Sequence, residues 1–147
     1  MRIVDYTQSH LHELMDGPLN DGAPQHIGYM RDWAEELQQK GWSYTLIENG
    51  HIICCAGIVN MWPGVGEAWF VASGKIHANV RPFIRFAKTD VMQKVVDEND
   101  LWRVQAVCKS DWPAAQKFAR FMGFEPEGVM RKYGPEGMDY IRVAWVR

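Results

Sequence analysis

The sequence predicts a single α/β domain in which helices cover both faces of a mixed β-sheet. Three observations lead to this prediction. The length of 147 residues suits one domain, and apolar residues recur with the periods of strands and of helices in turn. No linker, internal repeat or low-complexity run divides the chain. The expected order of elements is β-α-α-β-β-β-α-β-α-β-β, which would pack as one three-layer domain over residues 1–147.

The N-terminal part of the chain contains one expected strand and two expected helices. The strand covers residues 2–7, and Ser9 can cap a helix over 10–17 that the Gly17-Pro18 pair ends. A second helix is expected over 25–41, because its apolar residues recur at helical spacing: Ile27, Met30, Ala34 and Leu37.

The middle of the chain predicts a β-hairpin, a strand and a long helix. The hairpin covers residues 42–62, because Asn49-Gly50 is a strong signal for a tight turn in which both residues tolerate positive φ. A further strand is expected over 67–73. The long helix covers 79–99, where the apolar residues gather on one face.

The C-terminal part predicts a strand, a short helix and a final hairpin. The strand covers residues 101–108. The helix covers 112–122, where Asp111 can cap its beginning and Gly123 can end it in the left-handed conformation that glycine adopts freely. The hairpin is expected to pair residues 128–134 with residues 138–146.

Composition argues against several function classes. A formal net charge of −2 and a pI of about 6.2 do not suit a domain that binds duplex DNA through its phosphates. We therefore expect no nucleic-acid partner, although Arg81, Arg85 and Lys88 could form a local basic patch. The N-terminal residues lack the apolar segment of a signal peptide, and no run is long enough to span a bilayer. We expect a cytoplasmic protein without membrane contact.

The cysteines do not predict a disulfide framework. Cys54, Cys55 and Cys108 are odd in number, and two of them are adjacent, a spacing that rarely permits a disulfide bond. A reducing compartment fits this pattern best. All three residues fall in apolar segments, where a cysteine usually packs as a small hydrophobic residue.

The segment from Leu101 onward resembles the GNAT superfamily of N-acetyltransferases. In that family a strand is followed by a short helix that ends in Gly-Phe, and then by a hairpin. The matching residues here are Ala115, Phe118, Gly123, Phe124 and Gly128. The order of elements over most of the chain is also similar to the GNAT fold. The residues 69–73 (WFVAS), taken with the later Gly-Phe segment, are similar to short acetyltransferase-like proteins of tailed phages, which act in the host cytoplasm.

The resemblance implies an acyl-CoA-dependent N-acetyltransferase that passes the acetyl group directly to an amine, with acetyl-CoA as its cofactor. The strand at 67–73 would hold the pantetheine arm with its backbone, and the start of the following helix would hold the diphosphate. The cofactor-binding residues implied in this way are Phe70, Val71, Ala72, Ser73, Ala78, Asn79, Val80 and Arg81.

The segment that would bind the diphosphate departs from the family pattern. Active members usually carry Gln/Arg-x-x-Gly-x-Gly/Ala before the long helix, because glycines let the backbone approach the phosphates closely. Residues 73–83 contain only Gly74, and Pro82 removes one N–H group from the start of the helix. Free N–H groups near residues 78–81 could still bind an anion, so the sequence leaves coenzyme A binding open.

The expected proton-transfer residues are a carboxylate and a tyrosine. Glu67 is the candidate general base, because a carboxylate buried beside Trp69 could accept a proton near neutral pH. The alternative is that Glu67 is a solvated turn residue. Relatives often carry a tyrosine four residues before the glycine of Gly-Phe, where this chain has Ala119. Tyr133 and Tyr140 are candidate replacements, and the alternative is that both only pack against the sheet.

The acceptor site is expected between the loops at 20–25 and 60–67, with Trp62 and Trp69 as substrate-binding residues. Cys108 is a weaker candidate nucleophile, since no histidine is placed by sequence to activate it. No metal site is expected, because the histidines are scattered without ligand spacing.

Two functions remain open on the sequence. The first is the N-acetyltransferase, acting on a small-molecule or protein amine. The second is a catalytically inactive GNAT-like binding or assembly protein, which the missing glycines and Ala119 favour. The acceptor could be a simple amine, an amino acid, a protein lysine, a modified nucleobase or an aminoglycoside. The last strand could also pair two copies into a homodimer.

Overall fold

The computed structural model describes residues 1–19 and 31–147, and its centre is a mixed sheet of seven strands. The strand order is β1-β2-β3-β4-β5-β7-β6, and neighbouring strands are antiparallel except for β4 and β5. The strands are β1 (Arg2–Asp5), β2 (Ser43–Glu48), β3 (His51–Trp62), β4 (Val65–Ala72), β5 (Arg103–Lys109), β6 (Glu125–Met130) and β7 (Tyr140–Val146).

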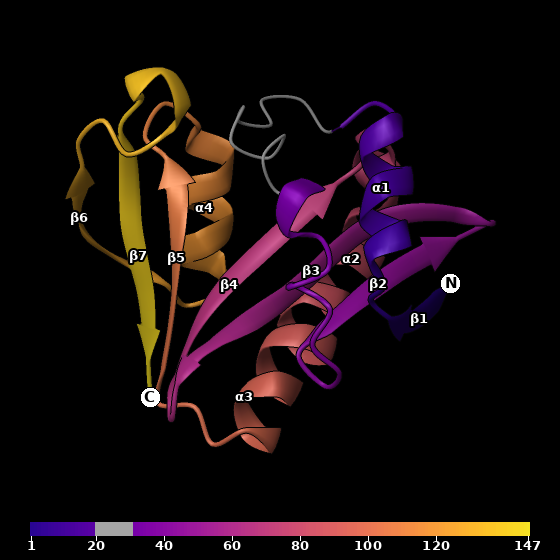
Figure 1. Cartoon of the computed structure of the whole chain (residues 1–147), viewed down its shortest axis with the longest axis horizontal. Coiled ribbons are helices and arrows are strands. Elements are labelled where there is room, and N and C mark those ends of the chain that lie inside the picture. The colour runs from indigo at the N-terminus through magenta and orange to yellow at the C-terminus, as the bar shows by residue number, and fades with distance from the viewer. Residues whose placement is uncertain (20–30) are drawn as a thin grey trace.

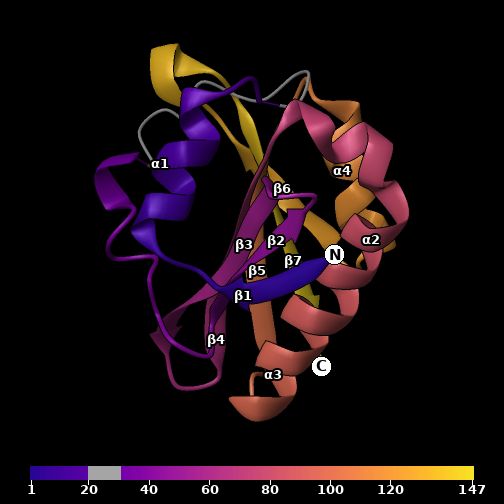
Figure 2. The same cartoon turned by 90° about the vertical axis from the view of Figure 1, so that its right-hand side faces the viewer.

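Helices cover both faces of this sheet, as the sequence predicts (Figure 2). One face carries α1 (Gln8–Asp16), and the other carries α2 (Val80–Arg85), α3 (Lys94–Glu98) and α4 (Pro113–Phe121). A π-helical stretch, Phe86–Gln93, joins α2 to α3, so the predicted long helix is confirmed as one continuous element with a wide central turn. The expected three-layer α/β fold is therefore confirmed. No helix in the described part of the chain is both long and apolar enough to cross a membrane.

The turn predictions are confirmed where they rest on glycine or asparagine. Asn49 and Gly50 connect β2 to β3 with φ values of 52° and 75°, and Gly123 ends α4 with a φ of 96°. Phe124, which follows, is buried among the side chains under the sheet. These positions were predictable because positive φ is a local property of the residue type.

The predicted helix over 25–41 is wrong in its described part, and residues 20–30 lie outside the described residues. Residues 31–40 form a short 3₁₀ turn followed by further turns. The Tyr6 hydroxyl donates to the carbonyl oxygen of Ala34 at 2.8 Å, and the Ser43 hydroxyl donates to that of Leu37 at 2.9 Å. These tertiary contacts use carbonyl groups that a continuing α-helix would bond internally, and so override the local helical pattern.

Two predicted helix caps are also wrong. Helix α1 begins after Thr7 rather than Ser9, and the N–H of Thr7 donates to Nδ1 of His10 at 3.2 Å. Helix α4 begins after Trp112, while Asp111 lies 3.3 Å from the Lys109 ammonium group instead of capping the helix.

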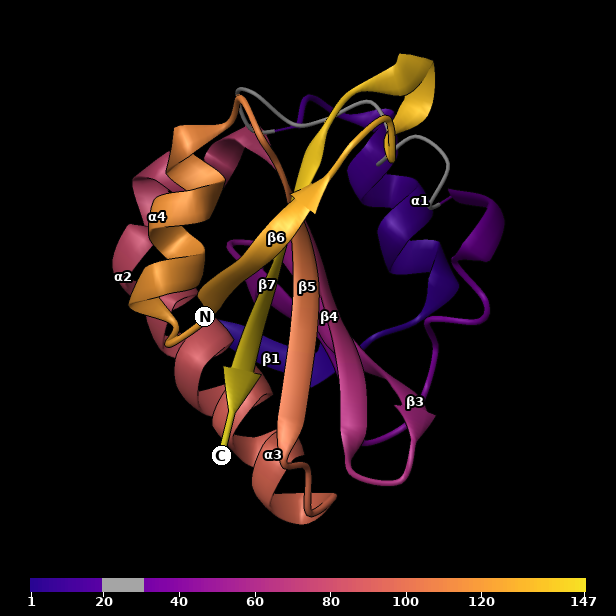
Figure 3. The same cartoon turned by 90° about the vertical axis from the view of Figure 1, so that its left-hand side faces the viewer.

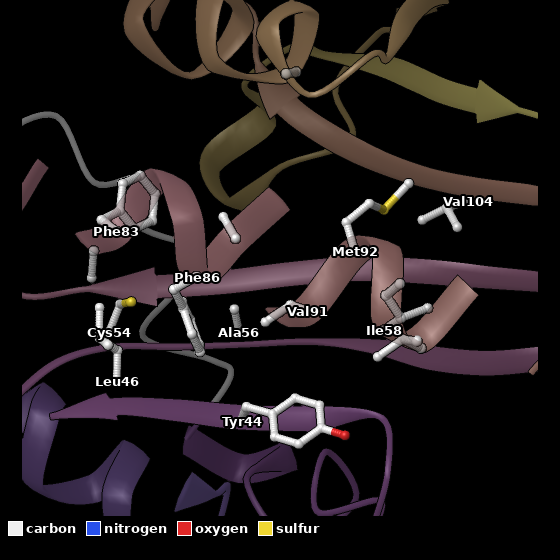
Figure 4. Close-up of a cluster of buried hydrophobic side chains, with 14 of the residues drawn as sticks. Tyr44, Leu46, Cys54, Ala56, Ile58, Phe83, Phe86, Val91, Met92 and Val104 are labelled. Carbon is white, nitrogen blue, oxygen red and sulfur yellow. The ribbon is translucent and has the colours of Figure 1, made fainter. Parts of the chain in front are cut away.

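The larger hydrophobic core lies between the sheet and the helices α2, α3 and α4. Phe86 is fully buried and extends from the π-helical stretch toward the strands β2 and β3 (Figure 4). A smaller cluster under α1 contains Tyr6, Leu11 and Leu14 with Val71 of β4. Strand β4 thus carries apolar side chains toward both faces, as expected of a central strand.

Candidate functional site

The strands β4 and β5 separate along their length. They pair in parallel only from Val65 opposite Arg103 to Glu67 opposite Gln105, although both strands continue well beyond this point. Figure 1 shows them diverging toward the ends that carry Ala72 and Lys109. Strand β5 stays paired with β7 over its whole length. The sheet therefore opens at its centre, between its two halves.

The separation exposes peptide groups on the edge of β4. The N–H of Ser73 donates to the carbonyl of Ile53 on β3 at 2.9 Å. Because peptide groups alternate in direction along a strand, those of Phe70 and Ala72 point to the opposite edge, toward the opening. No residue of β5 pairs with either of them in the described register. The edge thus offers hydrogen-bond donors and acceptors to a ligand lying between the strands.

A cavity of about 420 Å³ occupies the opening and reaches both faces of the sheet. On the helical side its wall includes three phenylalanine rings from different elements: Phe70 on β4, Phe83 on α2 and Phe118 on α4. The ring centroids of Phe83 and Phe118 lie 5.0 Å apart, and that of Phe70 lies 5.8 Å from each. These rings link α2 to α4 across the cavity and make this side strongly apolar.

Glu67 lies in the cavity wall at the point where β4 and β5 stop pairing. Nη1 of Arg142, on β7, donates to both carboxylate oxygens of Glu67 at 2.8 Å. The two side chains are 29% and 22% exposed, so the pair is partly shielded from water. Glu67 is therefore a residue of strand β4 and not a solvated turn residue. It is held in place by a guanidinium group.

The structure separates the two candidate tyrosines. Tyr133 is 50% exposed and lines the cavity, whereas Tyr140 is fully buried at the start of β7 and does not line it. Burial, with smaller contributions from Tyr133 and Asp111, raises the pKa of Tyr140 to about 12. The two rings pack edge to face with centroids 5.4 Å apart. Tyr133 and Glu67 thus line the same cavity, and Tyr140 packs against the Tyr133 ring from outside the cavity wall.

The two candidate substrate-binding tryptophans also differ. Trp69 lines the cavity on the side of α1, where its ring packs edge to face against Tyr6 at 5.2 Å. Its Nε1 atom is buried without a hydrogen-bond partner, which is true of no other buried side-chain nitrogen or oxygen in the described residues. Trp62 is 57% exposed at the end of β3 and is not part of the cavity wall. The structure therefore does not bring Trp62 to the site.

The thiol of Cys108 lines the cavity, but burial raises its pKa. A thiol that resists ionisation is a poor nucleophile. Cys54 and Cys55 are fully buried in β3, and burial raises the pKa of both. The described residues contain no cluster of side chains that could hold a metal ion.

The implied cofactor-binding residues lie in two segments of the chain. Residues 70–73 lie at the end of strand β4, and residues 78–81 span the end of a 3₁₀ helix and the start of α2. Phe70 and Ala72 line the cavity, whereas the side chain of Val71 packs under α1. Residues Gly74–Asn79 form a 3₁₀ helix in place of a loop, and the N–H groups at its start already have partners. Gly74 donates to Pro18, Lys75 to the Ser73 hydroxyl and Ile76 to the Ser73 carbonyl, at 3.0 to 3.2 Å. No backbone cradle for a diphosphate exists at these three residues.

Positive side chains occur beside the cavity instead. Both α2 with the π-helical stretch and α4 carry cations, and Lys88 lies 4.9 Å from the ring centre of Phe121 on α4. Figure 3 shows α2 and α4 on the same face of the sheet. None of these cations forms an ion pair within the described residues: Arg81, Arg85, Lys88, Lys117 and Arg120. This group, the helical basic face, could attract phosphate groups by charge.

Sequence reasoning missed Arg142 and the phenylalanine wall. Arg142 is a charged residue in an otherwise apolar final strand, which was the available signal. Its partner Glu67 is 75 residues away, so the pairing depends on β7 lying beside β5. Phe83 and Phe118 meet only because α2 and α4 are adjacent in the fold.

Comparisons with known proteins support the fold and not a particular substrate. No protein-family model matches the chain, and no curated protein sequence matches it. Solved structures do match along nearly the whole chain. A GNAT-family acetyltransferase from Bacillus anthracis superposes with a TM-score of 0.72 at 14% identity, covering 98% of this chain and 93% of that one.

Other matching structures carry different named activities. Spermidine N-acetyltransferase from Vibrio cholerae matches with a TM-score of 0.70 at 11% identity, over 99% of this chain and 95% of that one. The ribosomal-protein-S18-alanine N-acetyltransferase from Escherichia coli matches with a TM-score of 0.67 at 13% identity, over 99% of this chain and 92% of that one. The chain therefore has the GNAT acetyltransferase fold. At these identities the likeness does not select an acceptor.

Proposed function

We propose that this chain is an N-acyltransferase that moves an acyl group directly from acyl-CoA to an amine. The observation that carries the proposal is the cavity between β4 and β5, which joins three features. It has free peptide groups of β4 along one edge, a carboxylate and a phenol in its wall, and cations beside its helical side. An acyl-transfer site needs a thioester channel, a proton acceptor and a proton donor.

The residues fit the arm of coenzyme A better than they fit its diphosphate. The peptide groups of Phe70 and Ala72 are placed to hydrogen-bond an extended arm between the strands. Because the amides of Gly74, Lys75 and Ile76 are engaged, we assign phosphate binding to the helical basic face together with the N–H groups near residues 78–81. When bound, acyl-CoA supplies an acyl group already activated as a thioester.

Glu67 and Tyr133 are the proposed proton-transfer residues. As the amine nitrogen bonds to the acyl carbon and the carbon–sulfur bond breaks, the amine loses one proton and the sulfur gains one. Glu67 accepts the first of these protons, and its contact with Arg142 fixes the orientation of the carboxylate. Tyr133 is the candidate donor of the second, since it lines the same cavity and is open to solvent exchange.

The test measures thiol release and the acylated amine together, using acetyl-CoA and a mixture of primary amines. We expect Glu67→Gln to lower kcat by about 10² or more while leaving the Kd of acetyl-CoA unchanged. Glu125→Gln is the matched control, because Glu125 is exposed on β6 and does not line the cavity. Equal turnover by wild type and Glu67→Gln would remove Glu67 from the mechanism.

Two observations favour a second candidate function, a GNAT-like binding protein without transfer activity. The diphosphate segment is a bonded 3₁₀ helix, and Ala119 stands where many relatives carry a tyrosine. This candidate predicts that acetyl-CoA neither binds nor reacts. The two functions are therefore separated by a binding measurement.

A further inference from the structure

The part of the cavity on the side of α1 has a distinctive composition. Its wall consists of Trp33, Leu37, Val59, Met61 and Trp69, with Glu67 at its inner end. Leu37 belongs to the smaller core cluster, and Val59 and Trp69 pack against it, so this wall is a continuation of that core. The one other charged residue among the described lining residues is Lys109, which pairs with Asp111 at 3.3 Å. This region, the amine pocket, carries one carboxylate and the unpartnered indole N–H of Trp69 on an otherwise apolar wall.

The charge of that carboxylate is already balanced. Arg142 donates to both oxygens of Glu67, so the amine pocket has no uncompensated negative charge among its described residues. An acceptor with several ammonium groups would have to leave water without a matching carboxylate for each, which is strongly unfavourable. Among the described residues, the pocket therefore offers a polyamine or an aminoglycoside no second carboxylate.

A single amine on an apolar group does fit. Transfer into apolar surroundings favours the neutral form of an amine, which is also the nucleophilic form. Glu67 then needs to accept a proton only as the new bond forms, and the apolar group gains free energy from burial against the wall. The cavity volume of about 420 Å³ is in the range of small-molecule sites.

We propose that the acceptor is a small primary monoamine carried on an aromatic or branched aliphatic group. The amine lies at Glu67, and the apolar group lies against Val59, Met61 and Trp69. This inference rests on the proposed acyltransferase function and specifies the substrate class of the same site.

The experiment compares kcat/KM for phenethylamine, ethylamine, spermidine and kanamycin at saturating acetyl-CoA. Burying the phenyl group should raise kcat/KM for phenethylamine over ethylamine by about 30-fold. Met61→Ala should narrow this ratio, because it removes part of the wall that the phenyl group contacts. Met130→Ala is the matched control, because Met130 ends β6 outside the cavity and should leave the ratio unchanged.

The outcomes distinguish the monoamine acceptor from the acyl-transfer activity on which it rests. Acetylation of spermidine or kanamycin with kcat/KM equal to or above that of phenethylamine would overturn the monoamine assignment and leave acyl transfer standing. An unchanged ratio in Met61→Ala would also overturn it. Failure of wild-type protein to release thiol with any of the four amines would overturn the assignment, while a Tm raised by acetyl-CoA would leave the proposed acyltransferase function standing.

Discussion

The contact between Glu67 and Arg142 gives a stability prediction that does not depend on activity. The perturbations are Glu67→Gln, Arg142→Gln and the double variant. Each single variant removes the hydrogen-bonded partner of a partly buried charge, while the double variant replaces the ion pair by two neutral amides. We therefore expect each single variant to be clearly less stable, and the double variant to recover part of the loss.

The magnitude follows from the geometry. Hydrogen bonds to charged groups contribute about 1.5 to 3 kcal/mol when shielded, whereas exposed ion pairs contribute about 0.2 to 1 kcal/mol. With side chains 22% and 29% exposed, the coupling free energy between Glu67 and Arg142 should be about 1.5 kcal/mol. For 147 residues, a loss of about 2 kcal/mol in a single variant lowers Tm by about 6 °C.

The assay is urea unfolding of the wild type and the three variants, analysed as a double-mutant cycle. The matched control is the cycle for Asp97 and Arg147, which lie 3.2 Å apart but are 62% and 52% exposed. Its coupling free energy should stay below about 0.5 kcal/mol. If the Glu67–Arg142 cycle couples no more strongly than the control, the pair does not fix the carboxylate as argued.

Three further predictions follow from single residues. Because burial raises the pKa of the Cys108 thiol, Cys108→Ala should keep acyl-transfer activity within about twofold in the thiol-release assay, and a loss of 100-fold would make Cys108 a nucleophile. Burial, opposed by Glu13, lowers the pKa of His10 from its ordinary value of 6.5. The folded protein then binds this proton less readily than the unfolded chain. Neutral His10 therefore makes its full contribution to the free energy of unfolding above pH 6.5, and this contribution is lost as pH falls through the lowered pKa. When urea unfolding is measured at pH 7.5 and at pH 5.5, the free energy of unfolding should fall less in His10→Gln than in wild type. An equal fall in the two proteins would contradict this. Gly123→Ala should lower the free energy of unfolding by about 1 to 2 kcal/mol, because Gly123 has a φ of 96°. Gly17→Ala, at an extended φ of −103°, should cost less than about 0.5 kcal/mol, and equal losses in the two variants would refute the backbone argument.

Local signals in the sequence predicted most of the fold. The turn at Asn49-Gly50 and the helix end at Gly123 depend on backbone conformations that few residue types adopt, so the residue types alone identify them. The segment 31–40 was mispredicted for the opposite reason. Its apolar spacing suits a helix, but Tyr6 and Ser43, distant in sequence, bind the carbonyls of Ala34 and Leu37.

The candidate site was less predictable than the fold, because it is built from long-range contacts. Glu67 could be selected as a strand residue, but its partner Arg142 follows only from β7 lying next to β5. Tyr133 and Tyr140 are equivalent in the sequence, and they differ only in how deeply the last hairpin buries each ring. The loss of glycines after β4 was visible, but its structural consequence, a 3₁₀ helix with bonded amides, was not.

The central claim is that the opening between β4 and β5 binds an acyl thioester, and thermal unfolding with acetyl-CoA tests it most directly. At one hundred times its Kd, a ligand adds about 2.7 kcal/mol to the free energy of unfolding, which for 147 residues raises Tm by about 9 °C. We expect this rise in wild type and in Ala114→Trp, which alters the exposed surface of α4. Ala106→Trp, which fills the cavity from β5, should abolish it. No rise in wild type at millimolar acetyl-CoA, or an equal rise in Ala106→Trp, would contradict the claim.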